Sequence, residues 1–386
     1  MQRSESRILT THVGSLPRQA VLRDLLIQHE RGAAIDREAL TREADAAVQT
    51  VIEKQVEAGI DIINNGEQPR VGFSTYVVQR MSGFGGEAQR PTALDLEAFP
   101  DFAAKLQESR RHASRITYTA QAIDEIRYED LGEARRECES FLRYSEAKAG
   151  AFTERFITAA SPGIIATTML NAYYDTHDNY VYALARQMQK EYELIHAQGL
   201  LLQIDCPDLA MERTRLFKHD SLSQFQARVA LHIDAINQAV ANIPADRIRL
   251  HVCWGNHDGP HNYDVPLADI LPLLYDAKVG ALSIELANPR HQHEYKLFRK
   301  YPLPETMLLL PGVIDSTVNY IEHPEVVADR ICQVVEAVGD RSRVIASTDC
   351  GFGTFAGSEA VAPSVVWAKL RTLCEGADLA TSRLWN

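Results

Sequence analysis

Cysteine is scarce in this chain, and so are long apolar runs and basic residues in excess of acidic ones. Six cysteines among 386 residues are too few for a disulfide-rich scaffold, so we expect a reducing compartment. No run of about 18 apolar residues offers a transmembrane helix, and residues 1–7 lack the apolar core of a signal peptide. We therefore expect a cytoplasmic protein that does not use a membrane.

The formal net charge of −12 disfavours nucleic acid as a partner, because phosphate binding needs a basic surface. Hydrophobic residues at 45% and charged residues at 24% are typical of an ordinary globular protein. The expected partners are therefore small molecules, and assembly into a homo-oligomer stays open.

Eight segments have the apolar character of strands, and helical patterns separate most of them. The strands are expected near residues 8, 60, 155, 200, 248, 281, 307 and 343. This alternation predicts an α/β fold, a single (β/α)8 TIM barrel over residues 1–386, whose active site lies at the C-terminal ends of its strands.

The regular alternation of strand and helix patterns is interrupted between residues 72 and 150. We therefore expect an insertion after the second strand that covers one mouth of the barrel. Within it, the glycine cluster at residues 83–86 is typical of a loop. Residues 116–120 and 126–128 are expected to form a short hairpin or strand pair.

One strand end, in the stretch Arg249–Gly255, carries both an imidazole and a thiol. His251 and Cys253 are two residues apart, so an extended chain places both side chains on the same face. Glu285 and Cys350 also fall at strand ends. One nitrogen, two thiolates and one carboxylate would make a tetrahedral Zn2+ site, with Glu285 as the ligand that a substrate displaces most readily.

Each of these residues has a simpler interpretation. A histidine or cysteine on an apolar strand usually serves packing, and a carboxylate at a strand end often caps a helix. The coincidence of four suitable ligands at three strand ends nevertheless favours a metal. Further polar residues at strand ends are expected on the same rim as substrate-binding candidates: His12, Glu67, Asp205 and Asp315.

Thiolate-rich zinc suits the activation of a substrate thiol better than the activation of water. The favoured function is a zinc-dependent thiol S-alkyltransferase, in which a zinc-bound substrate thiolate attacks a methyl or alkyl carbon. Two alternatives stay open: a metal-dependent barrel hydrolase and a non-catalytic binding or methyl-carrier module. The chain lacks the His-x-His pair at the first strand that would favour the hydrolase.

The motifs, taken in order, resemble the catalytic domain of the cobalamin-independent methionine synthase superfamily. The matching stretches span nearly the whole chain: residues 11–15, 66–67, 203–205, 251–253, Glu285, 311–315 and 349–351. The resemblance implies a zinc site formed by His251, Cys253, Glu285 and Cys350. It also implies that Ser15, Glu67 and Asp205 hold the amino-acid end of homocysteine.

The chain also departs from the methionine synthase pattern. Cys206 stands where those enzymes usually carry a carboxylate, and residues 316–317 are Ser-Thr where a histidine is the proposed proton donor. The region of the tryptophan that stacks on folate aligns only loosely, with residues 171–174. A folate methyl donor is therefore an open question.

The sequences of residues 252–256, 287–291 and 348–353 are more similar to those of single-barrel members of the superfamily, which include epoxyalkane:coenzyme M transferase. In such an enzyme the thiolate opens an epoxide, and a cation binds the sulfonate. The candidate cations are Arg18, Arg70 and Arg290. Of the four nearby loop histidines, His257 and His291 are the candidate catalytic acids.

Overall fold

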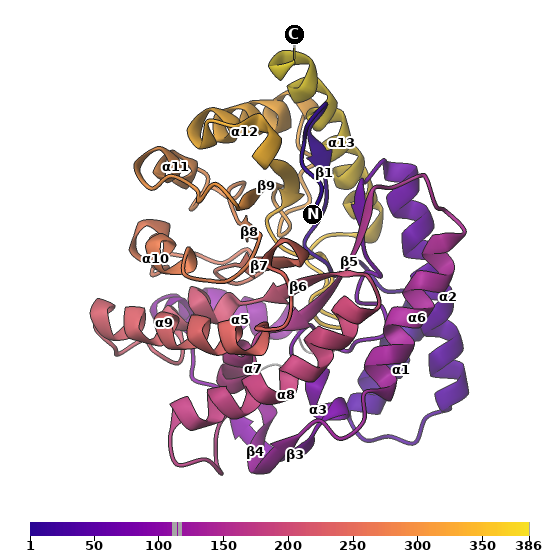
Figure 1. Ribbon diagram of the computed structural model, residues 1–386. Helices are drawn as coiled ribbons and strands as arrows, with labels where there is room; N and C mark the ends of the chain where they lie inside the picture. The colour runs from indigo at the N-terminus through magenta and orange to yellow at the C-terminus, as the bar shows by residue number, and fades with distance from the viewer. Residues whose placement is uncertain (110–113, 115–117, 386) are drawn as a thin grey trace.

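Eight parallel strands form the centre of the molecule in a computed structural model that describes residues 1–109, 114 and 118–385 (Figure 1). Their order in the sheet is β1-β10-β9-β8-β7-β6-β5-β2. A parallel bridge between Thr11 and Ile62 joins the two outer strands, so the sheet closes into the predicted barrel. The strands are β1 (Leu9–Thr10), β2 (Ile62–Ile63), β5 (Glu154–Ala160), β6 (Leu201–Asp205), β7 (Ile248–Val252), β8 (Ala281–Ile284), β9 (Leu308–Ile314) and β10 (Ile345–Thr348).

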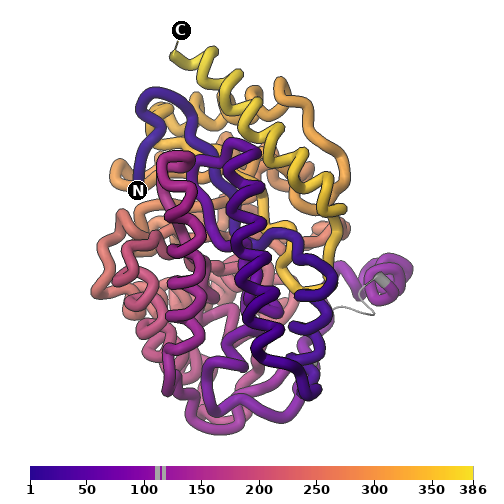
Figure 2. Tube along the Cα trace, turned by 90° about the vertical axis from the view of Figure 1, so that its right-hand side faces the viewer, coloured from indigo at the N-terminus to yellow at the C-terminus, as the bar shows by residue number. Residues whose placement is uncertain are grey.

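Helices surround the barrel and bury its outer face. They are α1 (Ala20–Glu30), α2 (Arg37–Ala58), α6 (Gly132–Glu146), α7 (Pro162–Thr168), α8 (His177–Ala197), α9 (Leu222–Ala239), α10 (Leu267–Leu274), α11 (Leu297–Lys300), α12 (Pro324–Val338) and α13 (Pro363–Leu384). Figure 2 shows α6 and α13 on either side of α2. Short 3-10 turns complete the connections: η1 (Pro207–Leu209), η2 (Met211–Thr214), η3 (Ala245–Arg247), η4 (Glu294–Lys296) and η5 (Arg341–Arg343).

Local sequence explains where these helices begin and end. Asp36 caps α2 by accepting from two backbone N–H groups, and Gly59 ends that helix in the left-handed conformation that glycine adopts without strain. At α9, Ser221 and Gln224 form a reciprocal capping box. No helix within the described ranges is long and apolar enough to cross a membrane.

Alternation along each strand separates two layers of core. Leu250 and Val252 point outward into the main apolar core under the helices. Arg249 points inward and is fully buried, with its guanidinium 4.0 Å above the ring of Phe156. It donates to Thr11 Oγ1 and to the carbonyl of His12, both at 3.1 Å. This inner layer supports the side chain of His251, one inward position further along β7.

A small antiparallel pair, β3 (Ser82–Gln89) and β4 (Tyr118–Arg127), is inserted after β2 with the short helices α3 (Val77–Arg80), α4 (Leu94–Ala98) and α5 (Pro100–Ser109). The loop expected at residues 83–86 is wrong, because these glycines belong to β3. The expected pairing of residues 116–120 with 126–128 is also wrong: 118–127 form one strand that pairs with β3. Residues 116 and 117 lie outside the described ranges.

The glycines explain why the pattern was misread. At Gly83 a Cβ atom would lie 2.5 Å from the carbonyl of Glu125, and at Gly85 one would lie 2.5 Å from Ile123 Cδ1. The two strands therefore approach closely only because side chains are missing there. A propensity argument counts these glycines as loop residues.

Buried ion pairs attach this insertion to the barrel. Glu137 of α6 lies 2.9 Å from Arg70 Nε and also pairs with Arg80. Glu191 of α8 accepts from the hydroxyl groups of Tyr76 and Tyr128. Burial raises the pKa of Glu137, but the two guanidiniums lower it more strongly, to about 2. The insertion is therefore fixed to the barrel wall.

Candidate functional site

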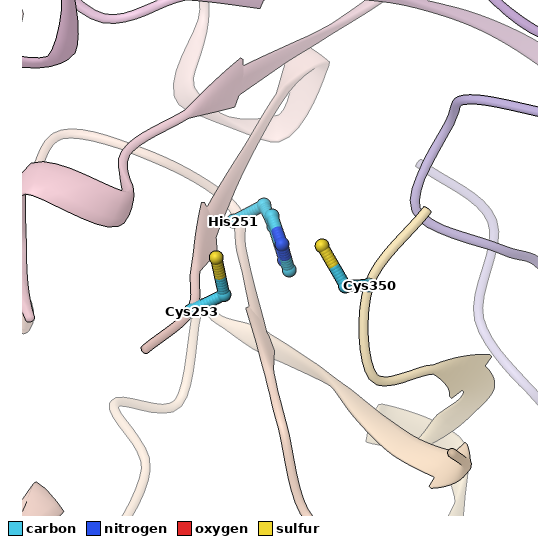
Figure 3. Close-up of side chains that lie close together, drawn as sticks. All are labelled: His251, Cys253 and Cys350. Carbon is cyan, nitrogen blue, oxygen red and sulfur yellow. The ribbon is translucent and has the colours of Figure 1, made fainter. Parts of the chain in front are cut away.

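Three side chains with metal-binding atoms meet at the C-terminal end of the barrel. His251 is the penultimate residue of β7, Cys253 comes directly after that strand, and Cys350 lies two residues beyond the end of β10. One ligand atom from each lies within 4.8 Å of the other two, and all three residues are buried (Figure 3). His251 Nδ1 lies 3.4 Å from Ser283 Oγ, whereas Nε2 has no hydrogen-bond partner among the described residues. The cluster therefore has the donor set and the unsatisfied nitrogen of a metal site.

The two sulfur atoms differ in their electrostatics. The contact with Cys350 lowers the pKa of Cys253 well below that of a free thiol, and His251 lowers it further. The same contact raises the pKa of Cys350 well above that of a free thiol. Burial opposes the charged form of His251, but Cys253 raises its pKa.

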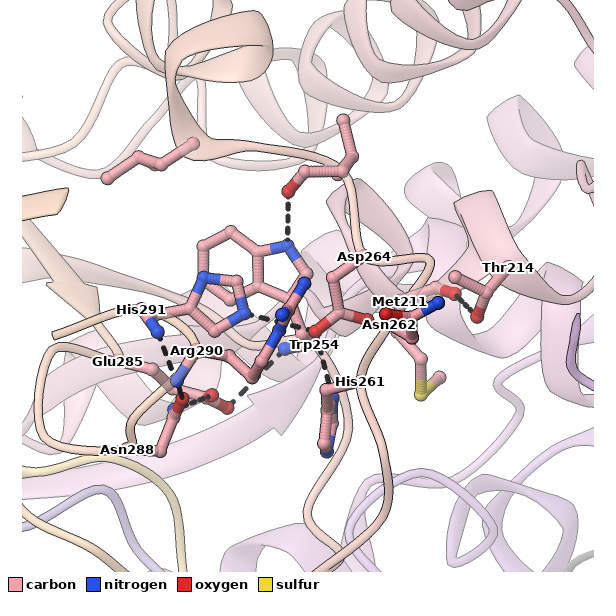
Figure 4. A network of polar contacts seen from close by, with 12 residues as sticks. Met211, Thr214, Trp254, His261, Asn262, Asp264, Glu285, Asn288, Arg290 and His291 are labelled. Atoms are coloured by element: carbon pink, nitrogen blue, oxygen red, sulfur yellow. Dashed lines mark hydrogen bonds and ion pairs between the residues drawn. The ribbon is translucent and has the colours of Figure 1, made fainter. Parts of the chain in front are cut away.

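Glu285, the fourth expected ligand, follows β8 beside this cluster but is not part of the 4.8 Å group. Its Oε1 accepts from the backbone N–H of Trp254 at 3.4 Å, and its Oε2 accepts from Asn288 Nδ2 at 2.9 Å (Figure 4). Burial raises its pKa well above the usual value, and the charge on Cys253 raises it further. The carboxylate is therefore held at the edge of the cluster.

Asp349 positions this edge, a role that the sequence reading missed. Its carboxylate accepts from the backbone N–H groups of Leu286, Ala287 and Asn288 at 2.8–2.9 Å. A Cβ at Gly312 would lie 2.0 Å from Asp349 Oδ1, so only glycine leaves room for the carboxylate. The Asp-Cys-Gly and Pro-Gly sequences carried this signal, because they bring a carboxylate and a missing side chain to neighbouring strands.

A cavity opens from the cluster. Its wall includes the cluster itself and three of the expected substrate-binding residues, Ser15, Glu67 and Asp205. The backbone of Gly351 lies close to Ser15, because a Cβ atom added at Gly351 would lie 2.1 Å from Ser15 Oγ. The metal-type donors and these polar groups therefore line one cavity.

Glu67 lies in the cavity wall with one of its carboxyl oxygens unsatisfied among the described residues. It adopts a left-handed backbone with φ 54°, a strained conformation for a residue with a side chain. Thr158 donates to Oε1 at 3.0 Å, while Oε2 is buried without a partner in the described part of the chain. Burial and the charge on Glu67 raise the pKa of Asp205 to about 7. Two carboxyl groups this close favour a positively charged ligand.

His257 also lines the cavity, and its neighbours orient its ring. Its Nδ1 accepts from the backbone N–H of Gly259 at 3.0 Å, so the neutral ring carries its proton on Nε2. The ring stacks on His261 with 4.3 Å between centroids. His261 has φ 50° and lies 2.8 Å from Asp264.

Three other expected site residues do not line this cavity. His12 Nε2 lies 2.8 Å from Gln55 Oε1 beneath the floor of the site, and burial lowers its pKa to about 4. Asp315 accepts from the backbone and hydroxyl of Thr317. His291 stacks on Trp254, with its two nitrogens directed at Glu294 and Asp264. These residues support the loops around the site.

The structure also shows cavity residues that no sequence motif predicts. Arg90 and Arg215 line the wall together with the apolar side chains of Phe73, Met211 and Phe355. Arg90 lies at the end of β3, in the insertion. No motif marks these positions, because they come from loops whose course is set by the tertiary structure.

Comparison with known proteins places this geometry in a family. The family model for the cobalamin-independent synthase catalytic domain matches residues 8–91 and 149–368. A methionine synthase of Sulfurisphaera tokodaii is 24% identical over 381 residues, covering 98% of this chain and 94% of the relative. One from Sulfolobus acidocaldarius is 26% identical over 345 residues, covering 89% and 85%.

Among solved structures, a B12-independent methionine synthase from Shewanella sp. W3-18-1, in complex with selenomethionine, has the same fold. Its TM-score is 0.72 at 18% sequence identity, covering 98% of this chain and 99% of that one. On the family match, which takes in the strand ends that carry His251, Cys253 and Cys350, the chain belongs to the family of cobalamin-independent methionine synthase catalytic domains.

Proposed function

We propose that this protein transfers a methyl group to the thiol of homocysteine with Zn2+ as its cofactor. One observation carries the proposal: the His251, Cys253 and Cys350 cluster opens into the same cavity as the carboxyl groups of Glu67 and Asp205. A thiol-activating group and an ammonium-binding group thus face one ligand. Methionine synthase relatives over nearly the whole chain support this choice.

The chain's own donors fit zinc. One imidazole nitrogen and two sulfur atoms match the ligands that Zn2+ prefers, and Glu285 is the proposed fourth donor at the edge of the cluster. A bound Zn2+ lowers the pKa of a coordinated substrate thiol enough to make it a thiolate at neutral pH. Ser283 fixes the His251 ring, and Asp349 fixes the loop after Glu285.

Glu67, Asp205 and Ser15 are the proposed binding groups for the amino-acid end of the substrate. The unpartnered Oε2 of Glu67 accepts from the ammonium group, which replaces a buried unsatisfied atom by a charge-assisted hydrogen bond. The ammonium charge also favours the ionised form of Asp205. The thiol end then points to the cluster.

The transfer itself requires a thiolate as the nucleophile and a donor that can leave with the electron pair. The substrate thiol releases its proton to solvent, its sulfur forms a bond to the methyl carbon, and the bond from that carbon to the donor breaks with its electron pair remaining on the donor. His257 is the proposed acid, because it lines the cavity and its Nδ1 accepts a hydrogen bond, which leaves the proton of the neutral ring on Nε2. We assign His291 a positioning role, since both its nitrogens already have partners.

The alternatives receive less support. Arg18 and Arg70, expected to bind a sulfonate, are engaged with the carbonyl groups of Gly353 and Thr158, and Arg290 is exposed. None of these three arginines lines the cavity, so the residues expected to bind a sulfonate do not support the epoxyalkane:coenzyme M reaction. A hydrolase would not need the Glu67 and Asp205 pair, and a binding module would not need the cluster.

The broader setting of the protein is part of the same proposal. Residues 1–386 form one barrel domain, with 72–150 as an insertion that carries β3 and β4. We propose that the protein acts in the cytoplasm on small molecules, without nucleic acid. Assembly into a homo-oligomer is left to measurement.

Product analysis tests the proposal. Zinc-loaded protein would be incubated with homocysteine and 5-methyltetrahydrofolate, and in parallel with coenzyme M and epoxypropane, and the products identified by mass spectrometry. We expect methionine from the first mixture and none after zinc removal. A hydroxypropyl thioether from the second mixture alone would replace this function by epoxide opening. Full zinc occupancy without alkylation of either thiol would contradict both.

A further inference from the structure

A second charged group lies on the cavity wall, apart from the cluster and the carboxyl groups. Arg90 is 8% exposed and lies 2.5 Å from Glu212 Oε1 through its NH2 group. Glu212 is fully buried, and its other oxygen accepts from the backbone N–H of Leu216 at 3.2 Å. The guanidinium is therefore held in one orientation.

The Nε of Arg90 takes no part in these contacts. It is buried and has no hydrogen-bond partner within the described ranges, although the side chain lines the cavity. A buried donor without an acceptor is unfavourable, and folded proteins contain few of them. A ligand that brings an acceptor removes this cost.

Arg215 strengthens the same part of the wall. Its Nη1 donates to the carbonyl of Pro91 at 3.1 Å. The loop after β3 and the segment around η2 are therefore joined by two contacts, this one and the ion pair between Arg90 and Glu212. Phe73, Met211 and Phe355 provide apolar surface in the same cavity. Two guanidiniums beside an apolar wall are suited to a ligand with an apolar body and an anionic end.

We propose that Arg90 and Arg215 form a subsite for an anionic group, a carboxylate or sulfonate, on the alkyl donor. The proposal rests on the proposed function for the identity of that ligand as the donor. Both arginines line the same cavity as the cluster and the carboxyl groups of Glu67 and Asp205. The insertion thereby contributes to donor selection, and the barrel strand ends contribute the thiol chemistry.

A pair of probes that differ only in charge tests the subsite. Binding of 4-phenylbutyrate and of its neutral amide would be measured by calorimetry on the full chain, with and without saturating homocysteine. We expect the acid to bind roughly tenfold more tightly than the amide in both conditions, since a charge-assisted hydrogen bond is gained. Equal affinity for acid and amide would overturn the proposal.

Variants locate the effect. Arg90→Gln combined with Glu212→Gln keeps a neutral hydrogen-bonded pair and should lose the preference for the acid. Arg90→Lys keeps the ion pair but lacks Nε, so it should weaken the preference even if the double variant fails to fold. Arg228→Gln, at a surface ion pair with Asp178, is the matched control and should keep the preference. Retention of the preference in both Arg90 variants would place the anion elsewhere.

The two proposals fail in different ways. The probe measurement needs neither turnover nor metal, so an intact preference for the acid in a protein that binds no homocysteine would refute only the proposed function. Homocysteine binding with no acid preference would refute only the anion subsite.

Discussion

At the scale of single residues, the site depends on atoms that nearly touch. Asp349 reaches the loop after β8 only because Gly312 has no side chain, and Ser15 reaches the cavity wall only because Gly351 has none. Asp349 and Ser15 are therefore accommodated at positions where a neighbouring side chain is missing. This makes the site sensitive to substitutions that remove no functional group.

Replacement of Cys253 or Cys350 by serine should abolish zinc binding and activity. Loss of a sulfur donor removes a direct ligand, and even loss of a partner behind a ligand costs about 10–100-fold in metal affinity. Zinc per chain would be measured by elemental analysis of the purified variants. Cys332→Ser, half-buried on α12, is the control and should keep its zinc. A Cys350→Ser protein with full zinc and full turnover would refute the site assignment.

Gly312→Ala should lower zinc occupancy although it changes no ligand. The new methyl group would overlap Asp349, and overpacking of this kind costs about 1–3 kcal/mol. Gly339→Ala is a matched control: it places alanine at φ 79° with open space around it, at a cost of about 1–2 kcal/mol. Both variants should unfold at lower temperature, but only Gly312→Ala should lose metal. Normal zinc in Gly312→Ala would show that Asp349 does not position the site.

Much of the site was predictable at this scale, because His251, Cys253 and Cys350 fall at strand ends that a barrel must bring together. His12 falls at a strand end as well, yet its ring turns to Gln55. The sequence pattern predicts how far along its strand a residue lies, but it does not predict the rotamer that neighbouring side chains impose. Arg90 could not be predicted, since its position depends on the course of the insertion.

At the scale of elements, the insertion is joined to the barrel by buried charge. Arg70, Arg80 and Glu137 form one network, and Arg70 also donates to Thr158, which in turn donates to Glu67. The attachment of α6 is thus connected to the cavity through four side chains. The eight strands followed from sequence periodicity, whereas the β3 and β4 pairing did not, because glycines at its close contacts resemble loop residues.

Glu137→Gln should destabilise the protein by about 3–5 kcal/mol, because it leaves two buried guanidiniums without their shared partner. The folded-state pKa of Glu137 is about 2, below its value of 4.5 in the unfolded chain. Its contribution is therefore fully present above pH 4.5 and is lost as the pH falls toward 2.

Urea unfolding of the wild type and of Glu137→Gln, at several pH values, measures this contribution. The stability difference between the two proteins should be constant above pH 5 and should shrink as the pH falls from 4.5 to 2. Glu133→Gln, at an exposed residue of the same helix, should show a small and constant difference. A difference for Glu137→Gln that does not change with pH would mean that its carboxylate is not stabilised by the arginines.

At the scale of the whole molecule, one barrel brings three functions to one mouth: sulfur and nitrogen donors from β7 and β10, carboxyl groups from the ends of β2 and β6, and guanidiniums from the insertion and η2. Parallel strands require this, since all their C-terminal ends lie on one side. Strand order was therefore enough to predict where the chemistry lies. The positions of Arg90 and Arg215 in the cavity wall could be found only from the structure.

The central claim is that a substrate thiol joins the metal held by His251, Cys253 and Cys350. X-ray absorption at the zinc edge, with and without homocysteine, measures the sulfur atoms around the metal. We predict two sulfur atoms in the protein alone and three after homocysteine is added, with glycine as a control that leaves the number unchanged. A sulfur count that stays at two while homocysteine is bound would contradict thiol activation at this site.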